Sequence, residues 1–152
     1  MNASDRKEVG MTLIVKTVTR LTVGLILLFG IYIVLHGHIS PGGGFAGGVI
    51  IALSFIHLML AFGKEAALKR LSEARAAMLE SFGALFFLTI AILGFLGGKF
   101  FVNFFIHKGE PFALFSAGSI PLANIAIAIK VGVGLFSMFI VLVVLQSSKD
   151  RE

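Results

Sequence analysis

The stretch His36-Gly-His-Ile-Ser-Pro-Gly-Gly-Gly-Phe-Ala-Gly-Gly48 lies between two apolar segments that are each long enough to cross a lipid bilayer. It opens the second segment, where each glycine costs about 1 kcal/mol of helix propensity relative to alanine. Close approach of another backbone is the usual compensation in a membrane, and the pairs Gly43/Gly47 and Gly44/Gly48 have the small-xxx-small spacing that permits it. A flexible hinge without a partner is the alternative. We expect a glycine-rich break at the start of the second membrane helix.

The same stretch also resembles two nucleotide-binding patterns, and neither has the context that it needs. Gly42, Gly44 and Gly47 have the spacing of a dinucleotide fingerprint, but that motif follows a β-strand in a soluble domain. Here it follows an apolar segment of membrane-spanning length. A phosphate-binding loop would end in Gly-Lys-Ser or Gly-Lys-Thr, and the stretch does not. Nucleotide binding is therefore rejected.

The composition predicts an all-α integral membrane protein. The chain has 152 residues, of which 57% are hydrophobic and 14% are charged, whereas charged residues approach about 25% in soluble domains. The sequence contains no cysteine, which rules out disulfides, iron–sulfur clusters and thiolate metal sites, so any electron transfer would occur in a partner. The net charge of +5 fits membrane topology and lipid attraction better than nucleic-acid binding, because the phenylalanines lie in apolar runs.

Four transmembrane helices are expected in a single polytopic domain. Their ranges are about 11–35, 45–62, 79–97 and 121–145. The first is expected to be retained as a helix, because no small-x-small cleavage pattern follows it. The charged segment 63–78 is predicted to be an interfacial helix or an extension of the flanking spans. The phenylalanine-rich segment 99–120 is too apolar for a solvent loop and is expected to lie in the interface or under partner subunits.

The distribution of lysine and arginine predicts the orientation. With four spans, the N-terminus, the segment 63–78 and the C-terminus share one side of the membrane and carry most of the basic residues. The opposite side has only Lys99 and Lys108. The positive-inside rule therefore places both termini in the cytoplasm and the turn from His36 to Gly44 outside a plasma membrane.

A family resemblance is carried by two motifs. The run Gly37-His38-x-x-Pro41-Gly42-Gly43-Gly44-Phe45-x-Gly47-Gly48 resembles the signature of the MnhB (MrpB) family, whose members are membrane subunits of Mrp-type multisubunit Na+/H+ antiporters. The second motif is Phe115-Ser116-x-Gly118-x-Ile120-Pro121-Leu122-x-Asn124-Ile125, followed by Lys130-Val131. The family also supplies subunits to archaeal membrane-bound hydrogenases, and the lysine in the last helix is more similar to those members.

This resemblance extends from Thr12 to Leu145 and implies a role in a larger assembly. It implies an integral membrane subunit whose glycine-rich turn and whose small faces of the second and fourth spans pack against neighbouring membrane subunits. Na+ and H+ are then the ions that the complex transports. In the hydrogenase-type setting, partner subunits would add redox chemistry and couple it to ion movement. The choice between a free-standing antiporter and a respiratory complex stays open.

Lys130 is the strongest candidate for a functional residue. It lies about nine residues past Pro121, or roughly 14 Å into a span of about 30 Å, near the middle of the membrane. A lysine there costs about 2.5–3.5 kcal/mol, so it should face protein or water. Ala126, Gly134 and Ser137 share its helix face and are all small. Lys130 is either a proton-relay charge tuned by a carboxylate of another subunit, or a permanent ion pair that locks two subunits together.

Three further ionisable residues could extend a hydrophilic path on the cytoplasmic half. His57 is either a neutral histidine hydrogen-bonded between helices or a titrating group. Glu80 is interpreted as an interfacial carboxylate at a helix start, stabilised by the helix dipole, or as a path residue with Arg20 as its counter-charge. Lys16 and Arg20, four residues apart, can also extend to the lipid headgroups.

The remaining polar candidates favour no chemistry within this chain. His36 and His38 could begin a metal site, but no nearby residue supplies the further ligands, and we interpret them as polar anchors at the outer surface. Catalytic triads, paired carboxylates and cofactor motifs are not found, so neither a metal nor a cofactor is expected in this chain. The alternatives to an ion-path subunit are a purely structural subunit that seals the complex, and a small self-sufficient channel.

Overall fold

The computed structural model describes residues 11–63, 72–98, 101, 106, 110 and 116–149. Within these residues the chain forms helices and no strands. The helices are α1 (Leu13–Leu35), α2 (Gly44–Phe62), α4 (Glu73–Leu96) and α5 (Ile120–Lys149). Each contains a stretch that is long and apolar enough to cross a membrane. The predicted all-α architecture with four membrane-spanning helices is thereby confirmed.

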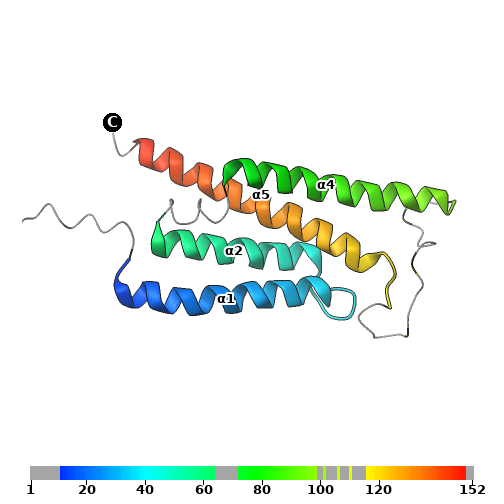
Figure 1. The fold of residues 1–152 in the computed structure, drawn as a ribbon, viewed down its shortest axis with the longest axis horizontal. Coiled ribbons are helices and arrows are strands. Elements are labelled where there is room, and N and C mark those ends of the chain that lie inside the picture. The colour runs from blue at the N-terminus through cyan, green and yellow to red at the C-terminus, as the bar shows by residue number, and fades with distance from the viewer. Residues whose placement is uncertain are drawn as a thin grey trace, which may run out of the picture.

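Successive helices run antiparallel, and they are not arranged in chain order (Figure 1). α1 packs against α2, α2 packs against α5, and α5 packs against α4. α5 therefore lies between α2 and α4, and α4 is joined to the rest of the bundle mainly through α5. The start of α1 and the end of α5 lie at the same end of the bundle, as an even number of spans requires. Which side of the membrane that end faces stays a prediction.

The third span begins earlier than the hydropathy suggests. α4 starts at Glu73 instead of near residue 79, because Ser72 caps the helix and good helix formers follow it. The Ser72 side chain accepts a hydrogen bond from the backbone N–H of Arg75 at 3.5 Å and another from its Nε at 3.1 Å. Part of the segment 63–78 is thus an extension of this span. Residues 64–71 and most of 99–115, on which the interfacial predictions rest, lie outside the described residues.

The start of α2 depends on glycine. Gly42 and Gly43 have φ angles of +143° and +90°, a region that side chains rarely allow. The helix begins at Gly44, whose backbone N–H donates to the Oδ1 of Asn124 on α5 at 3.3 Å. A Cβ at Gly44 would lie 2.4 Å from the backbone oxygen of Asn124, which is far closer than real Cβ contacts allow. The N-terminus of α2 is therefore capped and tightly packed by α5.

The next glycines of α2 face two different helices. A Cβ on Gly47 would lie 2.9 Å from the backbone oxygen of Gly30 in α1, and a Cβ on Gly48 would lie 2.9 Å from that of Ala128 in α5. The close backbone approach expected from the glycine spacing is present, so the hinge alternative is wrong. The expectation that neighbouring subunits cover these glycines is also wrong, because α1 and α5 of the same chain already do. Phe45, by contrast, is mostly exposed, and Pro41 is also exposed.

We predict that Gly44→Ala destabilises the chain, whereas Gly24→Ala in α1 does not. The new methyl group at residue 44 collides with the backbone of α5, and such overpacking costs about 1–3 kcal/mol. A Cβ at Gly24 meets nothing within 4 Å, so alanine there gains up to about 1 kcal/mol of helix propensity. Thermal unfolding in detergent, followed by circular dichroism, measures both. Equal melting temperatures for the two variants would contradict the packing described.

Candidate functional site

Lys130 lies in the middle of the apolar part of α5. The membrane-spanning stretch of this helix is Ile120–Val143, and the rise from Ile120 to Lys130 is about 15 Å, half of a hydrocarbon core of about 30 Å. The side chain is also 46% exposed in this chain. Lys130 thus lies near the middle of a membrane-spanning stretch, on a surface that the described part of the chain does not fully cover.

The Nζ of Lys130 donates to the Oε1 of Glu80 on α4, and the two side chains form an ion pair. The Glu80 side chain is 34% exposed, so the pair is only partly enclosed. The expectation that a carboxylate from another subunit faces Lys130 is corrected here, since α4 of the same chain supplies the opposite charge.

Small residues bring the two charges together. A Cβ on Gly83 of α4 would lie 2.9 Å from the backbone nitrogen of Lys130 and 3.0 Å from the backbone oxygen of Ala126, so the two helix backbones touch there. Ala126 is fully buried. A Cβ on Gly134 would lie 3.8 Å from the Oε1 of Glu80, an ordinary contact. The small face around Lys130 that the sequence predicts is therefore the face that receives α4.

The predicted roles of Glu80 and Arg20 need correction. Glu80 is not at a helix start, because α4 begins at Glu73, seven residues or about 10 Å earlier. The proposed pairing of Arg20 with Glu80 is wrong, since the carboxylate pairs with Lys130. The Arg20 guanidinium lies instead over the Phe62 ring of α2, 5.5 Å from its centroid, which is the geometry of a cation–π contact.

His57 joins α2 to α1, away from the ion pair. Its Nε2 lies 3.2 Å from the Oγ1 of Thr22. Thr22 in turn donates to the backbone oxygen of Val18 at 3.1 Å, so its oxygen can accept a hydrogen bond from the Nε2 of His57. This geometry shows a histidine that is hydrogen-bonded between two helices. The four candidates for an ion path thus fall into two separate groups, with Glu80 and Lys130 on α4 and α5, and Arg20 and His57 at the α1–α2 contact.

His36 and His38 lie in the turn between α1 and α2. The ring of His36 stacks on Tyr32 with 4.1 Å between centroids, and its Nδ1 lies 3.0 Å from the backbone oxygen of Tyr32. His38 is half-buried. Within the described part of the chain, no three or more histidine, cysteine or acidic side chains group in a way that could hold a metal ion. The positions fit polar anchors at one end of the bundle.

Asn124 is a structural residue that sequence reasoning named in a motif without giving it a role. Its Oδ1 caps α2, and its Nδ2 is buried with no hydrogen-bond partner among the described residues. The signal for such a role was present, because an asparagine four residues into a strongly apolar helix requires a polar partner.

The fold is that of a polytopic membrane protein, and an ion pair joins two of its membrane-spanning helices, α4 and α5. The chain belongs to the MnhB family, because a family model described as a domain related to the MnhB subunit of Na+/H+ antiporters matches residues 14–144. An uncharacterized protein of Methanocaldococcus jannaschii is 41% identical over 117 residues, covering 73% of this chain. A Staphylococcus aureus protein named "Putative antiporter subunit mnhB2" is 41% identical over 91 residues, covering 59% of this chain.

A solved structure is also similar. A chain of the membrane-bound sulfane sulfur reductase, an archaeal respiratory membrane complex, matches 89% of this chain with a TM-score of 0.74 and 29% identity. The match spans 61% of that chain, and the two relatives above are matched over 44% and 63% of their own lengths. This chain therefore spans less than two-thirds of the length of each of these three proteins.

We predict that Glu80 and Lys130 are energetically coupled. In the double-mutant cycle of Glu80→Leu and Lys130→Met, each single variant leaves one charge unpaired in the span, whereas the double variant leaves none. The expected coupling energy is about 0.5–3 kcal/mol, measured by denaturant unfolding in detergent. The matched control combines Glu80→Leu with Lys16→Met on α1, and these changes should add within about 0.5 kcal/mol. Additive effects of the Glu80 and Lys130 substitutions would contradict the pairing.

Proposed function

We propose that this chain is a multi-pass plasma-membrane subunit of an Mrp-like complex that exchanges Na+ for H+, with both termini in the cytoplasm. The MnhB match over residues 14–144 and the antiporter-subunit name of a relative support the antiporter class. Similarity to a chain of an archaeal respiratory membrane complex supports the related setting, in which redox subunits drive ion movement. Its partners are then the other membrane subunits of that complex.

The observation that carries this proposal is the half-exposed ion pair at mid-membrane depth. A charged side chain at the bilayer centre costs at least about 2.5–3.5 kcal/mol, so lipid chains are a poor neighbour for Lys130 and Glu80. A neighbouring subunit or a file of water molecules on this face of α4 and α5 removes that cost. The exposed side of the pair is therefore where an ion path along this subunit would lie.

The chemistry of the pair suits a relay. The ammonium group of Lys130 has three donors, and the Glu80 carboxylate uses one of its acceptor sites within the pair. The remaining donors and acceptors can bind water or a polar side chain of the neighbouring subunit. When a proton or a cation arrives on the exposed side, the pair can separate and each charge can take a new partner. This chain then moves charge without catalysing a chemical reaction.

A purely structural role is the second candidate, and one observation favours it. Lys130 already has its counter-charge within the same chain, so the pair can act as a fixed connection between α4 and α5. In that case the chain packs and seals the complex without lining an ion path. The two candidates differ in whether transport needs the charge of Lys130.

We predict that Lys130→Met lowers Na+/H+ exchange by roughly tenfold or more while the complex still assembles, because the relay loses its cation. Exchange is measured as Na+-driven pH change in membrane vesicles, and assembly by co-purification of the subunits. The control is Lys16→Met, which removes a lysine near the start of α1 and should leave exchange unchanged.

Two results would count against the ion-path proposal. Normal exchange in the Lys130→Met complex would favour the structural role. Exchange by the chain reconstituted alone would contradict the proposed dependence on partner subunits.

A further inference from the structure

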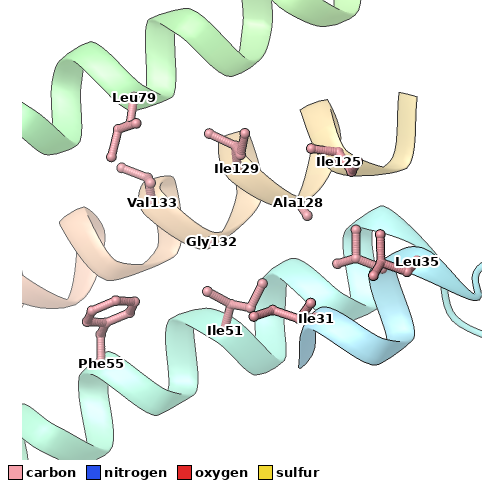
Figure 2. A pocket seen from close by; sticks show the side chains of 11 residues that line it. Ile31, Leu35, Ile51, Phe55, Leu79, Ile125, Ala128, Ile129, Gly132 and Val133 are labelled. Atoms are coloured by element: carbon pink, nitrogen blue, oxygen red, sulfur yellow. The ribbon is translucent and has the colours of Figure 1, made fainter. Parts of the chain in front are cut away.

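An open groove of about 390 Å³ lies along α5, and side chains from all of α1, α2, α4 and α5 line it. Figure 2 shows α5 running between α4 on one side and α2 with α1 on the other. Every lining residue is apolar, and the lining includes neither Lys130 nor Glu80. Apolar cavities do not hold ordered water, so this groove suits neither water nor ions. Its lining therefore suits hydrocarbon or an apolar protein segment.

The groove extends over one half of the membrane. Along α5 its lining runs from Ile125 to Val133, a distance of about 12 Å, compared with about 15 Å for one leaflet of the hydrocarbon core. At one end of the groove, each of two lining residues is next to a polar residue in the sequence. Leu35 directly precedes His36, and Ile125 directly follows Asn124. At the other end, Val133 lies just past the middle of the Ile120–Val143 span. The groove thus leads from polar residues to the centre of the bilayer.

We propose that this groove binds one acyl chain of a membrane phospholipid, from the leaflet on the side of the His36–Gly43 turn. A partner transmembrane helix fits poorly, because such a helix crosses the whole hydrocarbon core of about 30 Å, whereas the groove lining follows α5 for only about 12 Å. The groove ends near the bilayer centre, as an acyl chain does. Its apolar lining, which follows α5 over about the length of one leaflet, matches the hydrocarbon part of a lipid.

The bound chain supports the position of α4. This helix contacts the bundle mainly through α5, and Leu79, which lines the groove, points toward Val133 of α5 (Figure 2). Leu79 directly precedes Glu80, so a chain that fills the space beside Leu79 holds the first turns of α4 against α5. This inference concerns an apolar surface that includes neither Lys130 nor Glu80. It does not depend on the proposed transport function.

Native mass spectrometry of the full-length chain tests the proposal. The chain is reconstituted into vesicles of phosphatidylethanolamine and phosphatidylglycerol and then extracted with mild detergent. Ile31 lines the groove and is 43% exposed, so Ile31→Trp fills the groove with little effect on the buried core. The control is Phe29→Trp, at a comparably exposed position of α1 that does not line the groove.

The expected result is one retained phospholipid in the native chain and in Phe29→Trp, and a fraction of lipid-bound chain that is roughly tenfold lower in Ile31→Trp. If Ile31→Trp loses helical circular dichroism, Ile125→Trp at the outer end of the groove replaces it. Equal lipid retention in the groove variants and the control would overturn the proposal, and so would absence of lipid from the native chain. Side chains of another subunit in the groove of the intact complex would also overturn it.

Discussion

Helices in a bilayer gain little from hiding apolar surface, because the lipid is as apolar as they are. Association therefore depends on close packing and on polar contacts, and the start of α2 supplies both. Its glycines allow the backbones of α1 and α5 to approach at Gly47 and Gly48, and Asn124 binds the first amide of the helix. Adding a side chain would push α1 away at Gly47 and α5 away at Gly48. The central position of α5, on which the remaining structure depends, follows from this contact.

The same kind of contact decides where the charges lie. Gly83 lets α4 approach the backbone of α5 at Lys130, and this approach brings Glu80 into contact with the ammonium group. Because α4 packs mainly on α5, the pair stays near a surface and is not enclosed by the bundle. The surface of the chain therefore has two distinct features, an apolar groove along α5 and the ion pair of Lys130 with Glu80. These two features suit different neighbours, lipid for the first and protein or water for the second.

Sequence reasoning predicted the four spans, the place of Lys130 near the middle of the last span and the tight glycine contact, since hydropathy and small-residue spacing act locally along the chain. It did not predict which helices would meet. The glycines of α2 have the same spacing whether they face another subunit or α1 and α5, so their partner could not be read from the pattern. Likewise, hydropathy placed Glu80 at a helix start because it marks where the chain becomes apolar, whereas Ser72 decides where α4 begins.

The pairing of Lys130 with Glu80 could not be predicted for a related reason. Fifty residues separate the two side chains in sequence, and only the packing of α4 on α5 brings them together. The prediction that Arg20 would pair with Glu80 assumed that α1 and α4 are neighbours. In the structure α2 and α5 lie between them.

The most direct test of the account is a cryo-EM map of the intact complex at a resolution that shows side chains and water. The account predicts that another subunit or a file of water covers the exposed side of Glu80 and Lys130, with a polar group within hydrogen-bond distance of one of them. Lipid acyl chains packed directly against both charged groups would contradict it.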